Sequence, residues 1–123
     1  MRSLTALCVA ALFFTSCSAR INREHLVGTY TLQTKDGKAS LKLLPDGKLE
    51  QRVEPIQGAA RTVIGKWEWD QKAGNLILKD AIDIDGDHIG LRADVIMMPV
   101  VRTFLGSVKV QCDQDLECAY HKQ

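Results

Sequence analysis

The densest group of side chains with chemical potential lies in residues 83–88, where three aspartates and one histidine fall within six residues. A calcium loop of the EF-hand type places oxygen ligands at fixed offsets and a glycine at its sixth position. Counted from the first aspartate, further aspartates occupy the third, fifth and twelfth positions, but the sixth is His88. The aspartates in this series are Asp83, Asp85, Asp87 and Asp94. Because an Asp-Gly step also suits a hairpin turn, we expect a solvated turn at Asp83–Asp87, with a cation site as the alternative and no resident cofactor.

Serine and histidine, the residues of nucleophilic hydrolases, are sparse and far apart in the sequence. Beyond residue 16 the serines are Ser18, Ser40 and Ser107, and none lies in a Gly-x-Ser-x-Gly motif. The three histidines are scattered, and no pair of carboxylates has the pattern of an acid–base pair. We therefore expect a protein that is not an enzyme.

Trp67 and Trp69 share one face of an alternating segment, where they could line a ligand pocket or fill a core. Small barrels are usually filled by side chains, so we expect a packed core rather than a roomy cavity. The most apolar segment of the chain beyond its N-terminus is 95–101. If Ile96, Met98 and Val100 point outward, they form an exposed patch suited to a protein partner.

The N-terminus has the order of a secretory signal. A short basic segment is followed by an uncharged, largely apolar stretch, Leu4–Phe14, and then by small residues. That stretch is too short for a hydrocarbon core, which needs about 20 residues. Without residues 1–16 the chain has 107 residues and 15 basic against 15 acidic side chains. We therefore expect no nucleic-acid partner, because no basic excess remains to neutralise phosphates.

The segment Phe14-Thr15-Ser16-Cys17 resembles the lipobox of bacterial lipoproteins, in which a bulky apolar residue and two small residues precede a cysteine. The resemblance implies cleavage before Cys17, which then carries diacylglycerol on its sulfur. In enteric-type bacteria, Ser18 after the cysteine resembles the pattern that sorts lipoproteins to the outer membrane. Residues 17–25 are then a short membrane-proximal linker. The alternative is soluble export after cleavage at Ala19.

Two of the four cysteines remain once the first two are assigned. Cys8 leaves with the signal and Cys17 is the candidate lipid attachment site, so Cys112 and Cys118 form an even pair in an exported protein. They flank a polar loop between two strand-like segments. Five intervening residues do not match a C-x-x-C redox pair or a zinc knuckle. We expect a disulfide across a hairpin near the C-terminus.

Alternation with a period of two dominates residues 26–123, and turn residues break it at short intervals. The pattern predicts a single all-β domain, an antiparallel meander or barrel of about eight strands. Pro99 is expected to end or bend its strand, and 96–105 is the one stretch that could hold a helical turn. The expected strands cover 27–32, 40–44, 48–53, 62–70, 76–78, 88–98, 102–112 and 118–122.

A Gly-x-aromatic sequence opens two of the expected strands, at Gly28-Thr29-Tyr30 and Gly65-Lys66-Trp67. Together with the segment 41–49, these strings resemble lipocalins and small lipocalin-like bacterial lipoproteins. The resemblance implies a barrel in which the aromatic residue plugs one end, and it implies no activity.

These features predict a lipid-anchored protein of the cell membrane, on the outer membrane and facing the periplasm. Its barrel would be a non-enzymatic binding module for a protein or a small apolar ligand. The alternative is a periplasmic inhibitor or immunity protein that neutralises a toxin or a cell-wall enzyme. The expected partners are the membrane, through the lipid on Cys17, and a protein of the envelope.

Overall fold

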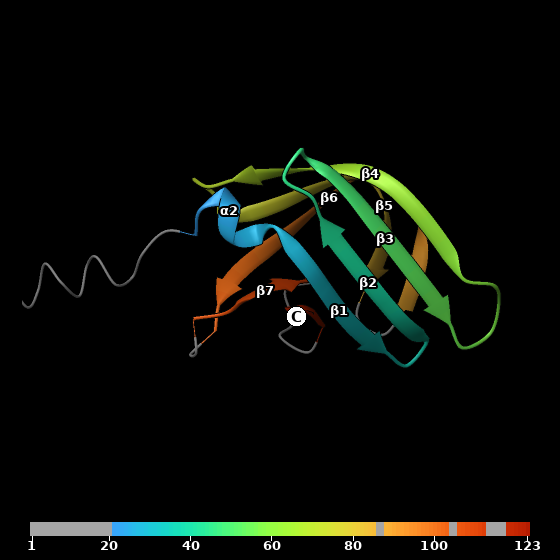
Figure 1. The fold of residues 1–123 in the computed structure, drawn as a ribbon. Helices are drawn as coiled ribbons and strands as arrows, with labels where there is room; N and C mark the ends of the chain where they lie inside the picture. The colour runs from blue at the N-terminus through green and yellow to red at the C-terminus, as the bar shows by residue number, and fades with distance from the viewer. Residues whose placement is uncertain (1–20, 86–87, 104–105, 113–117) are drawn as a thin grey trace, which may run out of the picture.

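The computed structural model describes residues 21–85, 88–103, 106–112 and 118–123, and shows an antiparallel β-barrel preceded by one helical turn (Figure 1). Each strand pairs with the next, and β8 pairs with β1 to close the barrel. The predicted barrel of about eight strands is therefore confirmed. The elements are α2 (Arg23–Leu26), β1 (Gly28–Thr34), β2 (Gly37–Leu43), β3 (Lys48–Pro55), β4 (Arg61–Asp70), β5 (Asn75–Asp85), β6 (His88–Arg102), β7 (Val108–Gln111) and β8 (Ala119–Lys122).

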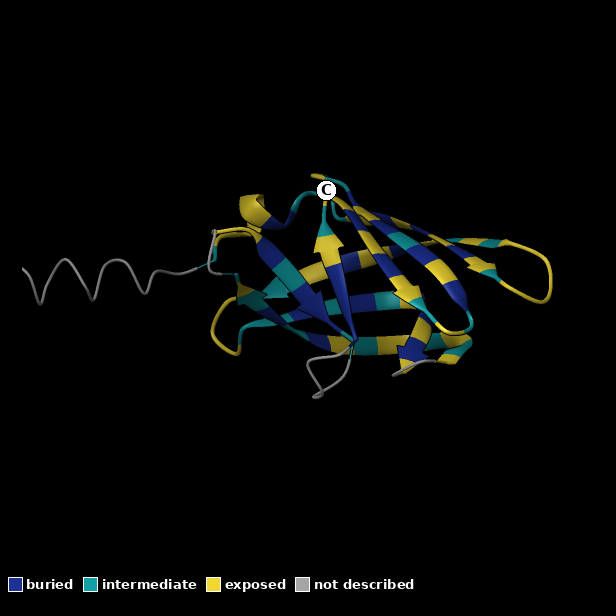
Figure 2. Cartoon of the chain, turned by 90° about the horizontal axis from the view of Figure 1, so that it is seen from below, coloured by how far each residue is buried: buried dark blue, intermediate teal, exposed yellow. Residues whose placement is uncertain are grey.

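The core lies inside the barrel and follows the alternation of the strands (Figure 2). In β1 the residues Tyr30 and Leu32 are buried while their neighbours are exposed. In β4 the face that contains Gly65 and Trp67 points inward, as the alternation predicts. A side chain at Gly65 would collide with the backbone carbonyl of Lys79 on β5, so close strand contact requires glycine at this position.

Strand β6 differs from the prediction in two ways. It continues through Pro99 to Arg102, because its pairing passes from β5 to β7 at this point: Asn75 lies opposite Pro99, and Val110 lies opposite Val100. The chain therefore forms no helical turn at 96–102, and the described helical turn is α2, inside the stretch expected to be a linker.

The expected outward patch on β6 is wrong. Met98 and Val100 are buried at 3% and 8% exposure, and Ile96 packs against the core. The opposite face points outward, and Leu91, Val95 and Met97 on it are exposed. Alternation could not decide between the two faces, because both are apolar in this segment.

The barrel is closed unevenly, because its last two strands are short. β7 and β8 have four residues each. β7 pairs with only the last three residues of β6, Val100–Arg102. β8 pairs with β1 only at Tyr30 and Thr31. The closing strands therefore span one part of the barrel, while the first part of β6 has no strand partner on that side within the described residues.

The predicted disulfide is present. Cys112 and Cys118 are bonded, with their Cα atoms 5.4 Å apart, a usual separation for this bond. The amide of Cys112 also donates to the carbonyl of Cys118 at 3.0 Å. The bond joins the end of β7 to the start of β8 and so holds together the two strands that close the barrel.

Candidate binding mouth of the barrel

One end of the barrel, next to Ile21, is sealed by aromatic side chains. The ring of Trp67 is 2% exposed, and its indole N–H donates to the carbonyl of Leu44 at 2.8 Å. The guanidinium of Arg23 lies over this ring, 4.3 Å from its centroid, and also donates to the carbonyl of Pro45 at 3.0 Å. The stacked cation and the ring together hold α2 against the turn between β2 and β3.

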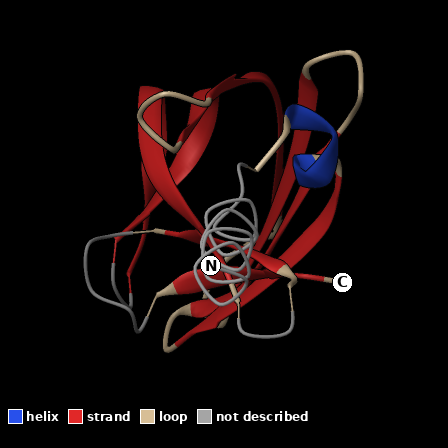
Figure 3. Ribbon diagram, turned by 90° about the vertical axis from the view of Figure 1, so that its left-hand side faces the viewer, coloured by secondary structure: helices blue, strands red, loops and turns tan. Residues whose placement is uncertain are grey.

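Figure 3 shows α2 beside the strands at this end, and three further hydrogen bonds hold the entering chain there. The hydroxyl of buried Tyr30 donates to the carbonyl of Leu26 at 2.6 Å. The indole of Trp69 donates to the carbonyl of Ile21 at 3.0 Å, and the ammonium of Lys122 donates to the carbonyl of His25 at 2.6 Å. Both tryptophans therefore serve the closed end and its core, and the interpretation of them as core residues is confirmed.

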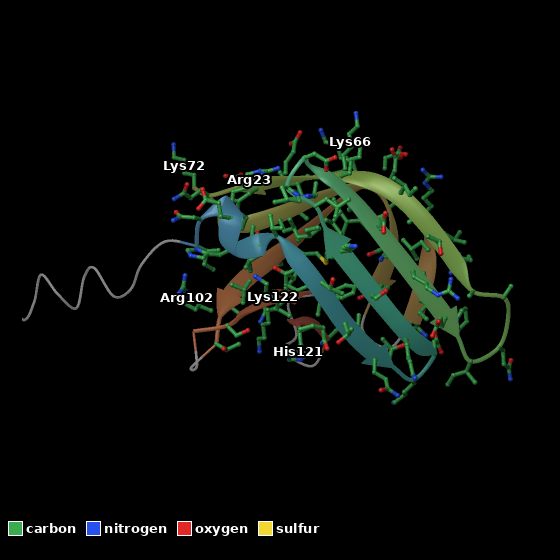
Figure 4. The ribbon with its side chains drawn as sticks, viewed as in Figure 1. Arg23, Lys66, Lys72, Arg102, His121 and Lys122 are labelled. Carbon is green, nitrogen blue, oxygen red and sulfur yellow. A yellow bond between two sulfur atoms is a disulfide. The ribbon has the colours of Figure 1, made fainter. Side chains whose placement is uncertain are left out.

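Basic side chains cluster around the closed end. Figure 4 shows Arg23, Lys72, Arg102 and Lys122 on the side from which the N-terminal segment leaves. Arg23 and Lys122 are held by the contacts above. The acidic side chains Glu24, Asp46 and Asp70 belong to the same end of the strands.

The opposite end of the barrel contains a hollow of about 740 Å³. It is the end where β1 finishes and β6 begins, so it lies away from residue 21. The lining comes from the β1–β2 turn, the β3–β4 loop and the start of β6. The lining residues are Lys35, Asp36, Pro55, Ile56, Gln57, Gly58, Ala59, Arg61 and Ile89.

Asp36 in the β1–β2 turn connects the segments around this mouth. Its carboxylate accepts a hydrogen bond from the amide of Ile89 at 3.2 Å and lies 3.3 Å from Nδ1 of His88. Its carbonyl accepts from the amide of Ile56 at 2.7 Å. Arg61 reaches the carbonyl of Gly90 at 3.1 Å. These contacts give the mouth a defined rim in which apolar and charged side chains alternate.

Below the mouth, the barrel interior is filled. Gln51 is 1% exposed, and its amide N–H donates to the carbonyl of Ile82 and to the hydroxyl of Tyr120, both at 3.0 Å. Its carbonyl oxygen accepts from the amide of Ile82 at 2.6 Å. No buried side-chain nitrogen or oxygen of the described residues lacks a partner. None of these interior residues lines the hollow at the mouth, which is open to solvent rather than enclosed.

Burial perturbs both tyrosines of the chain. Burial raises the pKa of Tyr30 to about 12. Burial also raises the pKa of Tyr120 to about 12, with the nearby Asp83 carboxylate adding to the rise and the hydrogen bond from Gln51 opposing it. Both phenols therefore remain neutral at physiological pH.

A second hollow of about 460 Å³ lies over the outer face of β1, β2 and β3, beside His121 of β8. Polar side chains of the three strands contribute most of its lining. They are Thr31, Gln33, Lys38, Ser40, Arg52 and Glu54. Arg52 and Glu54 form an exposed ion pair at 3.0 Å, an arrangement typical of a solvated strand face.

The residues singled out from the sequence are dispersed in the structure. Cys17, Ser18 and Asp87 lie outside the described residues. Asp83 and Asp85 are exposed on β5, and Asp85 lies opposite His88 in the hairpin. Among the described residues no group of three or more histidine, cysteine or carboxylate side chains is arranged to hold a metal ion.

The sequence interpretation missed the two polar residues that organise the barrel. Gln51 shares the inward parity of Leu49 and Val53, and a polar residue inside an apolar alternation was the available signal. Asp36 lies in the β1–β2 turn, and nothing local in the sequence indicates its contact with Ile89, 53 positions away.

The fold and the site define a small closed antiparallel β-barrel with one plugged end and one end that carries an open mouth. No family model, curated protein or solved structure matches this chain. In the part of the chain that the structure describes, no helix has the length and apolar character to cross a bilayer.

Proposed function

We propose that this chain is an exported lipoprotein whose barrel is a non-enzymatic binding module. Its lipid attachment site is Cys17, and its location is the periplasmic face of the outer membrane. The proposal rests on the lipobox-like segment for the anchor and on the mouth for the binding surface. Three residues, 18–20, separate the proposed anchor Cys17 from Ile21, where the described chain meets the closed end of the barrel.

The arrangement of the two ends is the observation that supports this function. The tether joins the plugged end, whereas the hollow of about 740 Å³ lies at the other end. A ligand at the mouth is therefore not obstructed by the anchor. Several acyl chains on one cysteine hold a protein firmly to a bilayer, since each buried methylene contributes about 0.8 kcal/mol.

The shape of the mouth favours a protein as the ligand over a small apolar molecule. The hollow at the mouth is open rather than enclosed, and small ligands prefer deep, enclosed pockets. Ile56 is 74% exposed on the β3–β4 loop, beside the wholly exposed residues 57–60. An exposed apolar residue on a loop is also suited to enter a partner's cleft, which supports an inhibitor or immunity protein as the second candidate.

The anchor is tested by Cys17→Ala in the native host. We expect the variant to leave the membrane fraction and to lack acyl mass, while the wild-type chain stays in the membrane. A Cys17→Ala protein that remains membrane-bound, or a wild-type protein without acyl groups, contradicts the anchor.

The mouth is tested by capture of the partner from the envelope with the intact, acylated protein. Ile56→Asp should abolish stoichiometric recovery of a partner. The matched control is Ile64→Asp, which places the same change at an exposed isoleucine, 65% exposed, on the outer face of β4. Equal recovery with both variants excludes the mouth, and recovery of lipid without protein indicates a small-molecule ligand.

A further inference from the structure

Strand β6 has an open edge over most of its length. It pairs with β5 from His88 to Pro99, and within the described residues a strand on its other side, β7, begins only opposite Val100–Arg102. An open edge presents unpaired backbone N–H and C=O groups, which form a template for another strand. Asp36 binds the amide of Ile89, so the available stretch begins beyond that residue.

The outer face of the same stretch is apolar and exposed. Leu91 is 80% exposed, Val95 56% and Met97 65%. Apolar residues that lie together in this way on a soluble domain mark an interaction surface. The exposed face and the open edge belong to the same strand, so one partner strand would cover both.

Two charged side chains lie within this stretch on the other face. Arg92 and Asp94 have the parity of the buried Met98, yet both are exposed because no strand continues the sheet beside them. Neither forms an ion pair within the described part of the chain. Their signs are opposite, and one residue, Ala93, separates them.

We propose that β6 pairs with β6 of a second copy of this chain, in antiparallel register about a two-fold axis at Ala93. In this register Arg92 of each copy lies opposite Asp94 of the other. Leu91 of each copy lies opposite Val95 of the other on the outer face. In each pair the two side chains lie on the same face of the joined sheet, as the alternation of side chains along paired strands requires.

One geometry thus satisfies three separate features: the open edge, the exposed apolar face and the two charges without ion-pair partners. Opposite charges placed directly across a strand pair are favourable, and like charges are unfavourable. A two-fold interface uses the same patch on both partners, so a self-complementary charge pattern is what it needs.

The two-fold arrangement is compatible with the barrel and with a membrane tether. The five central residues 91–95 avoid the position where Asp36 holds Ile89. The β5–β6 register shifts between Ile82 and Ile84, so Leu91 lies in this irregular step, next to the regular stretch that begins at Arg92. The axis is perpendicular to the strands, so the Ile21 ends of both copies lie at equal height when the axis lies along the membrane normal.

Charge reversal at Arg92 and Asp94 provides the test. If the two residues only stabilised the fold, mixing the two reversed variants would not restore association. Arg92→Asp places two aspartates opposite each other in both pairs, and Asp94→Arg places two arginines opposite each other. Each variant should self-associate about tenfold less strongly or worse than the wild type. A mixture of the two variants should associate, because each pair then contains one aspartate and one arginine.

The assay uses two full-length copies that carry different C-terminal tags, co-expressed and extracted in detergent, with capture through one tag. Wild type with wild type, and Arg92→Asp with Asp94→Arg, should co-purify, whereas each variant with itself should not. Arg102→Asp, an exposed reversal on the same strand outside the pairing, should co-purify with itself. Thermal unfolding of each variant confirms that it is folded.

Two outcomes overturn the proposal. One is a wild-type chain that does not co-purify with itself. In that case the charges of Arg92 and Asp94 protect the open edge of β6 from pairing. The other is self-association that neither reversal weakens, which places any dimer interface elsewhere. Neither outcome depends on the Cys17 anchor or on the mouth, whose tests are separate.

Discussion

Replacing Gln51 with leucine should destabilise the barrel more than a change on its surface. After Lys79, β5 no longer pairs with β4, and the amide and carbonyl of Ile82 bind the Gln51 side chain instead. The substitution leaves these two backbone groups and the hydroxyl of Tyr120 without that partner in a buried site. Each lost group costs about 2 kcal/mol, and burial of the leucine offsets about 2–3 kcal/mol of the total.

The expected loss in the free energy of unfolding is therefore about 3 kcal/mol, measured by urea denaturation. In a domain of this size it lowers the melting temperature by about 12–24 °C. The matched control is Glu50→Leu, the exposed neighbour on the same strand, which should change stability by less than about 0.5 kcal/mol. A Gln51→Leu protein within about 1 kcal/mol of the wild type refutes the argument that this amide replaces the missing strand contact.

Three further predictions concern stability. The pKa values of about 12 for Tyr30 and Tyr120, against 10.0 unfolded, mean that their contribution is complete below pH 10 and is lost as the pH rises towards 12. At pH 11 the loss is about 1 kcal/mol for each tyrosine, and absorbance should show most of the phenolate appearing on unfolding; a folded protein that is mostly phenolate at pH 10–11 contradicts this. Replacing both Cys112 and Cys118 with serine should lower the free energy of unfolding by about 2 kcal/mol, from the small loop that the bond closes, and an unchanged urea midpoint excludes this. Gly65→Ala should cost about 1–3 kcal/mol, because its Cβ meets the backbone of β5; a stability equal to that of the wild type shows that the strands can separate there.

Much of the fold could be predicted from alternation and turn chemistry. Lys35-Asp36 joins β1 to β2, whose first residue is Gly37, and Pro45-Asp46-Gly47 lies between β2 and β3, because Asp-Gly and Pro-Asp-Gly steps favour tight turns where they separate alternating segments. The cysteine pair was predictable because two cysteines remained on either side of a short polar loop. These signals are local, and local geometry determines hairpins.

The parts that could not be predicted depend on contacts between distant segments. Pro99 does not end β6, because its partner changes there from β5 to β7, and alternation carries no information on partners. The inward face of residues 95–101 is ambiguous for the same reason, since both faces are apolar and burial is decided by which neighbouring strand is present. The mouth depends on Asp36 and Ile89, which come together only when the barrel closes.

The two ends of this barrel respond differently to sequence change, and this difference bears on function. At the plugged end, Tyr30, Trp67 and Arg23 each satisfy a specific backbone carbonyl, so a substitution there leaves a buried or partly buried polar group without its partner. At the mouth, Ile56 and residues 57–60 are exposed, and substitutions at exposed loop positions change stability little. Changes in the exposed loop therefore leave the fold intact, which is what the proposed binding function at the mouth requires.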